Sequence, residues 1–442
     1  MITENNIIRL LSALIVVMLG IATAPMYADP NQIAEPNQMG KFREKWLCRM
    51  PSSAKGVVRS VSINGCHIAW MEPRGKQQVV VVDGQAGPEY DEILGGTLTY
   101  SSNGKRLAYG ARKGTKQSVV IDSQAGLEYD RIYAIPVFSL DGERVAYMAQ
   151  KGDKWLVVVD GQPGPEYDGL LEGSLIFSPD GKRMAYGVRK GNKRMVVIDG
   201  QMGLEYDGIG TVPVFSSTGN SVAYAAQVAQ QKGYKWFVVI DGQSGPEYDR
   251  VSNLVFSPDG KRGAYAAQKG DKWIAVIDGQ TGPEYDGISN LVFSPDGKHV
   301  AYVAQKYYKW FVVVDGQTGQ EYDGIGNLAF SPDGKHVTYA AQAVQKSYRW
   351  FVVIDGQAKP EYDGLGALVF SLDCGHVAYA AQKGKKWQVI VDDQAGPEYD
   401  SVVCRPVFLK DGTLEYIVLK GGSLYRVNFT PQEVSEPSST GP

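Results

Sequence analysis

A repeated segment runs through most of this chain, and each copy carries the same two short motifs. One motif is DGQTGPEYD in its fullest form, and its copies are spaced from 37 residues (Asp241 to Asp278) to 42 residues (Asp199 to Asp241). Its first aspartate recurs at Asp83, Asp122, Asp160, Asp199, Asp241, Asp278, Asp315, Asp355 and Asp392. The other motif, FSPDGK with variants, runs in phase with it and begins at Val61, Tyr100, Phe138, Phe177, Phe215, Phe256, Phe293, Phe330, Phe370 and Phe408. A repeat of this period indicates a solenoid, a propeller or a similar array.

The unit from Ser289 to Gly324 shows what each copy folds into. Short apolar runs rich in β-forming residues, NLVF, HVAYVAQ and WFVVVD, are separated by SPDGK, KYYK and DGQTG. Pro, Asp and Gly favour turns, and Asp-Gly between two strands is a strong hairpin signal. QEYDGI completes a fourth strand. Four short strands leave no room for a helix of ordinary length, so each unit is expected to be a four-stranded antiparallel sheet. Sheets in radial repetition form a β-propeller.

The fold class expected is therefore all-β, a β-propeller of about ten four-stranded antiparallel blades. Ten blades exceed the usual range of about 4–8. No linker interrupts the repeat near residues 249–253, which favours a single large ring over two five-bladed rings. The last unit lacks an EYD strand, and the segment EKWLCRM, which precedes Val58, can supply the missing outer strand. The propeller is expected to cover residues 44–430.

The N-terminus has the pattern of a secretory signal. Arg9 precedes the apolar run Leu10–Ala24, and small residues follow, so we expect a signal peptide over residues 1–28 with cleavage after Ala28. An uncleaved anchor over Ile7–Ala24 is the alternative. Residues 29–43 and 431–442 are polar and are expected to be a flexible linker and a disordered tail. The mature protein is then periplasmic or secreted, without a membrane span.

The balance of charged residues limits which kinds of partner are expected, and the cysteines raise the question of disulfide bonds. Lysine and arginine number 45 against 48 acidic residues, so the basic surplus of a nucleic-acid-binding protein is missing. Export makes Cys48, Cys66, Cys374 and Cys404 candidates for disulfides, and four cysteines allow three pairings. If EKWLCRM joins the last blade, Cys48 lies near Cys374 and Cys404. Four buried thiols are the alternative.

The motif FSPDGKHVAY followed by an apolar strand ending in Asp resembles the WD-repeat-like propeller repeat of TolB-type proteins. The resemblance extends over roughly residues 58–429 and is confined to the repeat. The chain has no room for the α/β domain that precedes the propeller in TolB, and GPEYD is not part of the usual repeat. The resemblance implies a β-propeller that acts as a protein-interaction scaffold.

The most variable turn of the repeat supplies the candidate binding residues. The turn before the third strand, usually KGDK, becomes VAQQKGYK, KYYK and AVQKSYR in three copies. The candidate partner-binding residues are Tyr234, Tyr307, Tyr308, Tyr348, Lys306 and Arg349. Aromatic residues with basic neighbours are typical of protein or glycan contacts. Lysines such as Lys154, Lys193 and Lys272 are expected to make this face basic.

The other repeated polar and aromatic residues are expected to be structural. The EYD carboxylates occupy equivalent positions, whereas acid–base catalysis needs carboxylates with different surroundings, so an outer-strand charge pattern is favoured. His67, His299, His336 and His376 occupy one position of different units and are expected to be exposed turn residues, not metal ligands. The repeated tyrosines and tryptophans are expected to pack between blades. The sequence indicates no catalytic residue, metal or cofactor.

The function expected is that of an exported, non-enzymatic, monomeric scaffold that binds a protein of the envelope or exterior. A lectin-like binder of cell-wall or surface polysaccharide is the first alternative. A propeller hydrolase or lyase acting on polysaccharide is the second. No nucleic acid is expected as a partner.

Overall fold

The computed structural model describes residues 42–49, 59–61, 67–210, 212–231, 233–343 and 349–430. These residues form β-strands and turns and contain no helix. The strands pair into ten antiparallel sheets. The predicted fold class, an all-β propeller built from ten antiparallel blades, is confirmed. In blades 2, 4, 5 and 10 the first strand is divided into two short pieces, which gives those sheets five strands.

The described residues fall into two compact units, and the boundary lies in the turn after Gly270. The first unit begins with blade 1, of β2 (Arg59–Val61), β3 (Ile68–Arg74), β4 (Gln77–Val82) and β5 (Gln85–Tyr90), and blade 2, of β6 (Glu92–Ile93), β7 (Thr99–Tyr100), β8 (Leu107–Lys113), β9 (Lys116–Ile121) and β10 (Gln124–Ala125). Blade 3 follows with β11 (Arg131–Phe138), β12 (Val145–Lys151), β13 (Lys154–Val159) and β14 (Gln162–Tyr167). Blade 4 has β15 (Gly169–Leu170), β16 (Ile176–Phe177), β17 (Met184–Lys190), β18 (Lys193–Ile198) and β19 (Gln201–Met202). Blade 5 has β20 (Gly208–Ile209), β21 (Val214–Phe215), β22 (Val222–Gln230), β23 (Gly233–Ile240) and β24 (Gln243–Ser244), and the unit ends with β25 (Arg250–Phe256) and β26 (Gly263–Lys269) of blade 6.

The second unit begins with the other two strands of blade 6, β27 (Lys272–Ile277) and β28 (Gln280–Tyr285). Blade 7 has β29 (Gly287–Phe293), β30 (Val300–Lys306), β31 (Lys309–Val314) and β32 (Gln317–Thr318). Blade 8 has β33 (Gly324–Phe330), β34 (Val337–Ala343), β35 (Arg349–Ile354) and β36 (Gln357–Tyr362). Blade 9 has β37 (Gly364–Phe370), β38 (Val377–Lys383), β39 (Lys386–Val391) and β40 (Gln394–Ala395). Blade 10 has β41 (Ser401–Val402), β42 (Val407–Phe408), β43 (Leu414–Lys420), β44 (Ser423–Phe429) and β1 (Phe42–Arg49).

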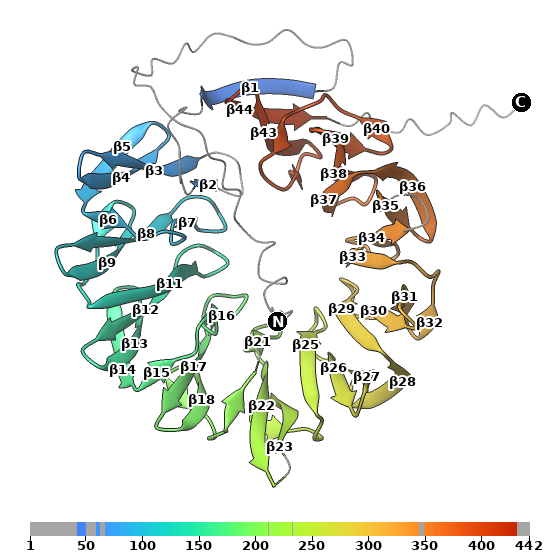
Figure 1. The fold of residues 1–442 in the computed structure, drawn as a ribbon, viewed down its shortest axis with the longest axis horizontal. Helices are drawn as coiled ribbons and strands as arrows, with labels where there is room; N and C mark the ends of the chain where they lie inside the picture. Colours follow the sequence, from blue (N-terminus) through green and yellow to red (C-terminus); the bar gives the residue numbers. More distant parts are fainter. Residues whose placement is uncertain are drawn as a thin grey trace, which may run out of the picture. The chain divides into compact units, whose positions relative to one another are not determined.

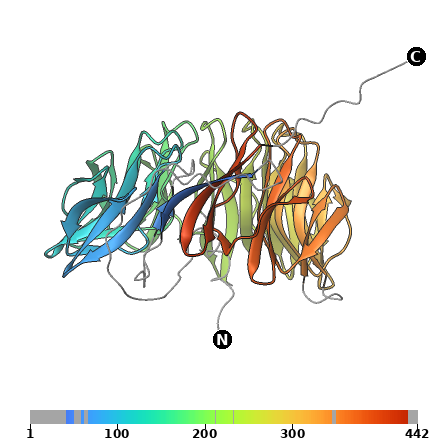
Figure 2. The ribbon, with the colours of Figure 1, turned by 90° about the horizontal axis from the view of Figure 1, so that it is seen from above.

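Within each unit, consecutive blades follow one another side by side (Figure 1). The first strand of a blade lies on the inner side of the row and the fourth on the outer side. Seen from the side, the strands run between two faces (Figure 2). Because the strands alternate in direction, the turns after the first and third strands share one face, and the turn after the second strand lies on the other.

The first of these faces, which we call the Asp-Gly face, carries the SPDG and DGQ turns. The aspartate of each DGQ turn adopts a left-handed conformation, with φ of 49° at Asp83 and 51° at Asp278, and a glycine with positive φ follows each of these two. This is the two-residue hairpin turn that Asp-Gly favours. The predicted role of DGQ as the turn between the third and fourth strands is therefore confirmed.

Blade 10 is built from both ends of the described chain. Strand β1 pairs antiparallel with β44, with Phe42 opposite Phe429 and Trp46 opposite Tyr425. The prediction that EKWLCRM supplies the outer strand of the last blade is confirmed. The strand begins at Phe42, two residues before the expected boundary at 44, because the rings of Phe42 and Phe429 pack at 4.6 Å and extend the pairing.

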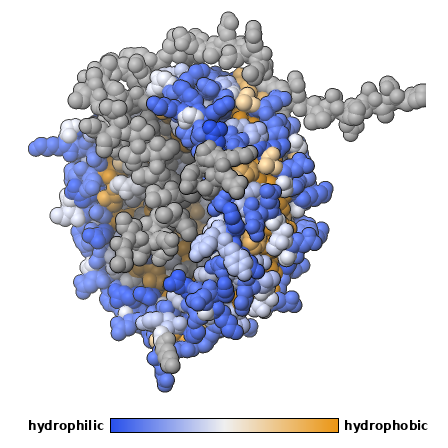
Figure 3. All heavy atoms as spheres, turned by 45° about the vertical axis from the view of Figure 1, so that its right-hand side comes forward, coloured by the Kyte–Doolittle hydropathy of each residue, from blue (hydrophilic) through white to orange (hydrophobic). Residues whose placement is uncertain are grey.

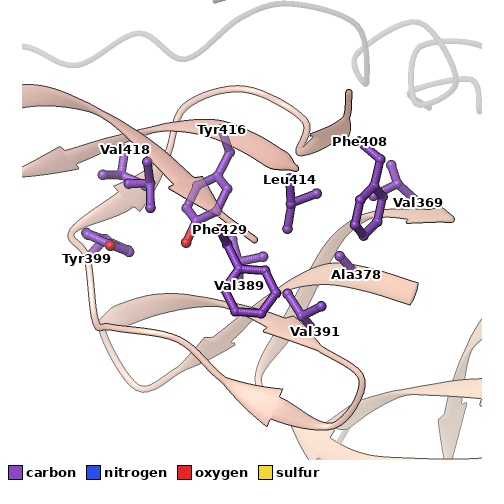
Figure 4. Close-up of a cluster of buried hydrophobic side chains, with 11 residues drawn as sticks. Val369, Ala378, Val389, Val391, Tyr399, Phe408, Leu414, Tyr416, Val418 and Phe429 are labelled. Carbon is purple, nitrogen blue, oxygen red and sulfur yellow. The ribbon is translucent and has the colours of Figure 1, made fainter. Parts of the chain in front are cut away.

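The core lies between neighbouring blades and is lined by the apolar second and third strands. Figure 4 shows one such cluster, in which Val389 of blade 9 lies among Leu414, Tyr416 and Phe429 of blade 10. Tyrosines of the second strand are buried, and the EYD tyrosines meet them edge to face, for example Tyr167 and Tyr186 at 6.2 Å. The tyrosines therefore pack between blades as predicted. The tryptophans that open the third strands are only partly buried, because their position lies at the end of the strand, near a turn.

Candidate functional site

The turn between β30 and β31 of blade 7 places two consecutive tyrosines at the surface. Tyr307 and Tyr308 both have left-handed backbones, with φ of 51° and 66°. Their side chains are 78% and 90% exposed, and Tyr308 is the most exposed large hydrophobic residue of the described chain. Figure 3, which shows one face of the molecule, is dominated by hydrophilic side chains where the chain is described. Among the exposed large hydrophobic residues of the described chain, Tyr307 and Tyr308 are the only two adjacent aromatic residues.

Glycine occupies the position of Tyr307 in most other blades, as at Gly152, Gly270 and Gly384, each with positive φ. A left-handed conformation is easy for glycine but strained for a bulky side chain. Such strain occurs preferentially at functional sites, where selection maintains a residue that the fold alone does not favour. Glycine would therefore fit the backbone of this turn with less strain than tyrosine. The presence of the two tyrosines indicates a role other than forming the turn.

The surroundings of the two tyrosines hold the turn in place. The backbone N–H of Tyr307 donates to Asp286 Oδ2 at 2.8 Å, so the backbone contact that glycine makes elsewhere is kept. Lys306 Nζ lies 5.6 Å from the centre of the Tyr307 ring, a cation–π distance. Lys306, Tyr307 and Tyr308 therefore form one exposed group, which we call the tyrosine turn.

The remaining candidate residues lie elsewhere. Tyr234 lies in β23 of the first unit and is 57% exposed; it pairs with Ala229 in a lengthened hairpin, not in the expected loop. Arg349 Nε lies 3.6 Å from Asp363 Oδ1, where other blades have a lysine–aspartate pair, which indicates a structural role. Tyr348 lies outside the described residues. The structure thus brings together three of the six candidates.

The last aspartate of EYD connects each blade to the next, a role that the sequence did not suggest. Asp168 of blade 3 accepts a hydrogen bond from Lys154 Nζ at 2.6 Å and, with its other oxygen, from the N–H of Gly191 in the blade 4 turn at 2.7 Å. These two donors hold the pKa of Asp168 below its usual range. Equivalent pairs of contacts are made by Asp130, Asp207, Asp249, Asp286 and Asp400. We call these residues the latch aspartates and their face of each blade the latch face.

The latch changes two expectations from the sequence. The EYD carboxylates are more than an outer-strand charge pattern, because Asp168 bridges two blades while Glu166 is exposed. The expected basic character of the latch face is reduced, since Lys154, Lys193 and Lys272 are each paired with a latch aspartate at 2.6 or 2.7 Å. Neutral pairs of this kind create no strong attraction for anionic polymers.

The histidines pair with the DGQ aspartates. The Nδ1 atoms of His67, His299, His336 and His376 lie 2.5 or 2.6 Å from Oδ2 of Asp83, Asp315, Asp355 and Asp392. Three of these side chains are about half exposed, as predicted for turn residues, whereas His376 is 15% exposed. Among the described residues, no group of three or more His, Cys, Asp or Glu side chains is arranged to hold a metal ion.

The cysteines that the structure describes are free thiols. Cys374 Sγ accepts the N–H of Asp333, and Cys404 Sγ accepts the N–H of Ile417, both at 3.2 Å. Burial raises the pKa of the Cys404 thiol. Cys66 and the side chain of Cys48 lie outside the described part, as do Ala28 and the segments 1–41 and 431–442. None of the described segments forms a helix that is long and apolar enough to cross a membrane.

Comparisons with known proteins find likeness to solved propeller structures. No protein-family model matches the sequence, and no curated protein matches it. The β-propeller domain of the Trilobed protease from Pyrococcus furiosus is 14% identical, with a TM-score of 0.33, and the match covers 61% of this chain and 99% of that one. Putative TolB from Agrobacterium tumefaciens is 15% identical (TM-score 0.26; 45% and 84% covered), and the Dos1 propeller is 9% identical (0.33; 89% and 95%). The likeness, including that to TolB, is one of repeat and fold.

Proposed function

We propose that this protein is an exported, non-enzymatic scaffold that binds a protein partner in the periplasm or outside the cell through its tyrosine turn. The observation that carries the proposal is the pair of exposed tyrosines at Tyr307 and Tyr308, held in a backbone conformation that suits glycine. Tyrosine is enriched at protein interfaces because its ring contributes a large contact area and its hydroxyl a hydrogen bond. The neighbouring Lys306 adds a charge at the rim of this contact.

The regular blades supply the support for such a contact. Each latch aspartate connects its blade to the following turn, and Asp286 does so directly to the backbone of Tyr307. A recognition group on a rigid element binds with less loss of conformational freedom than one on a mobile loop. In this proposal, the side chains that differ from the repeat, Tyr307 and Tyr308, bind the partner, and the repeated latch aspartates keep the turn rigid.

The test compares the natural chain with Tyr307→Gly/Tyr308→Asp, which introduces the residue pair found at Gly152 and Asp153. Both chains are immobilised and exposed to the envelope fraction of the native cell, and bound protein and glycan are quantified by mass spectrometry. Asp153→Ala, in the same turn of blade 3, is the matched control. We expect a stoichiometric protein partner that is lost with the double variant and kept with the control.

Other results would overturn parts of the proposal. Equal capture by the natural chain and the double variant would exclude the tyrosine turn as the binding site. Capture of polysaccharide without protein would replace the scaffold by a lectin. Export is tested separately by sequencing the N-terminus of the native protein, which we expect to begin at Asp29; an intact Met1 in a cytosolic fraction would contradict it.

A further inference from the structure

A cavity of about 440 Å³ lies between blades 1 and 2, on the Asp-Gly face of the first unit and apart from the tyrosine turn. Its volume is within the range of small-molecule sites, about 300–1,000 Å³. The polar residues that line it are His67, Asp83, Gln85, Tyr100, Lys105, Asp122 and Ser123. The turn residue Gly104 and the apolar Val82 and Leu107 complete much of its wall. Carboxylates, a phenol and apolar surface thus converge on one space.

At the next three junctions between blades, an arginine of the preceding blade occupies the corresponding place. Arg144 of blade 3 shows the pattern: its Nε donates to Asp160 at 3.0 Å and its Nη1 donates to the carbonyl oxygen of Gly181, in the next blade, at 3.0 Å. Its guanidinium carbon lies 5.1 Å from the centre of the Phe177 ring. Arg106 over Phe138 and Arg183 over Phe215 make the same three kinds of contact. The repeat therefore contains a guanidinium position formed by a carboxylate, a backbone carbonyl and an aromatic ring.

At the junction of blades 1 and 2, histidine and tyrosine replace this arginine and phenylalanine. His67 Nδ1 lies 2.5 Å from Asp83 Oδ2, which reproduces the contact of the arginine Nε. The His67 ring stacks on Tyr100, with 6.3 Å between centres and 25° between planes. An imidazole is shorter than an arginine side chain, so the place of the terminal guanidinium nitrogens is left open. Gly104 and Lys105, the counterparts of the residues whose carbonyls accept from arginine at the next junctions, line the cavity instead.

Tyr100 adds a hydroxyl that phenylalanine lacks at the other junctions. This oxygen is buried and has no hydrogen-bond partner among the described residues. Burial and the nearby Asp83 carboxylate raise the pKa of this hydroxyl, so it stays neutral and is able to accept an N–H. A buried polar atom without a partner is unfavourable, and a ligand that supplies a donor relieves this. Tyr100 lines the cavity, so a ligand bound there is a candidate source of this donor.

We propose that this cavity binds a guanidinium group that a ligand supplies, either a free guanidino compound or an arginine side chain of a peptide. The ligand's N–H groups would donate to the Tyr100 hydroxyl, to the turn backbone at Gly104 and Lys105, which lines the cavity, and to the carboxylate of Asp122. A guanidinium has five donors in a planar fork, which suits several acceptors around one space. Lys105 is exposed on a flexible stem, and Arg106 is paired with Asp122 Oδ2 at 3.0 Å, so neither cation occupies the site.

The sharpest test fills the cavity with the protein's own guanidinium. His67→Arg places at this junction the side chain that the next three junctions carry, and it is expected to fold at least as stably as the natural chain. Binding of methylguanidinium to the purified full chain is measured by isothermal titration calorimetry. We expect saturable binding that weakens at least tenfold with His67→Arg and several-fold with Tyr100→Phe. His376→Arg, the same exchange beside Phe408 in the second unit, is the matched control and is expected to leave binding unchanged.

The two sources of the guanidinium are separated by a further comparison. Tighter binding of a short arginine-containing peptide than of methylguanidinium supports a peptide ligand, and equal binding supports a free guanidino compound. Several results would overturn the proposal: absence of saturable methylguanidinium binding to the natural chain, equal binding by His67→Arg, or equal binding of methylammonium in its place. The tyrosine turn is untouched by these variants, so the outcome is independent of the proposed scaffold function.

Discussion

The tyrosine turn allows a prediction in which loss of binding accompanies a gain in stability. Replacing Tyr307 by glycine and Tyr308 by aspartate removes two bulky left-handed residues, with φ of 51° and 66°. Each such residue costs about 1 kcal/mol or more. Against this, glycine adds about 0.5–1 kcal/mol of conformational entropy to the unfolded chain, and the exposed Lys306–Tyr307 contact is worth about 0.5 kcal/mol. The net expectation is a gain of about 0.5 kcal/mol or slightly more.

Thermal unfolding followed by circular dichroism measures this gain. A change of 1 kcal/mol shifts the midpoint of a domain of 150–250 residues by about 2–4 °C, so we expect the double variant to melt about 1–3 °C above the natural chain. Tyr308→Ala alone removes an exposed ring while leaving an L-residue at positive φ, and is expected to change the midpoint little. A double variant less stable than the natural chain would refute the argument, because the tyrosines would then be there to stabilise the turn.

Three further predictions concern contacts within and between blades. Glu44 on β1 accepts hydrogen bonds from the Tyr399 hydroxyl at 3.0 Å and from Lys420 Nζ at 2.8 Å. Glu44→Ala is therefore expected to lower the free energy of unfolding by about 2–3 kcal/mol and to increase hydrogen exchange in β1, whereas Glu44→Gln, which keeps an acceptor, lowers it by under about 1 kcal/mol. Equal hydrogen exchange in the two variants would contradict this. Ser178 is buried, donates a hydrogen bond to Asp180 and accepts one from the N–H of Arg183. Ser178→Ala is therefore expected to lower the free energy of unfolding, measured in urea, by about 1–2 kcal/mol. Lys182→Ala, at an exposed residue of the same turn, is the control and is expected to change it by close to zero. Folding lowers the pKa values of the latch aspartates, and it lowers that of Asp333 to about 2. Their stabilisation is therefore full above the unfolded pKa near 4 and is lost as the pH falls below it through the lowered folded values. A midpoint that stays constant as the pH falls below about 4 would contradict the latch.

Much of the fold can be predicted because the residues that specify turns and strands are close together in the sequence and recur in every unit. The Asp-Gly pairs specify hairpin turns by their own backbone preferences, and the apolar runs around them specify strands, so ten sheets follow from spacing alone. The placement of EKWLCRM in blade 10 also follows, because one unit lacks a strand and one unassigned segment has the composition of a strand.

The latch and the details of the sites depend on contacts that spacing does not show. Asp168 meets Lys154 of its own blade and Gly191 of the next, and only the stacking of blades brings the three together. Tyr234 was expected in a loop because an insertion and a longer hairpin have the same polar composition. The exchange of phenylalanine for tyrosine at Tyr100 was visible in the sequence, but its meaning required the cavity beside it.

The pairing of β1 with β44 has a consequence for the order of events during synthesis. The segment Phe42–Arg49 leaves the ribosome long before its partner Ser423–Phe429 has been made. Throughout that interval β1 is without its partner in blade 10, and contacts so distant in sequence form slowly. A chain truncated before Ser423 would present the unpaired edges of β1 and β43, which are templates for aggregation. Blade 10 can therefore close only once the chain has been made as far as Phe429.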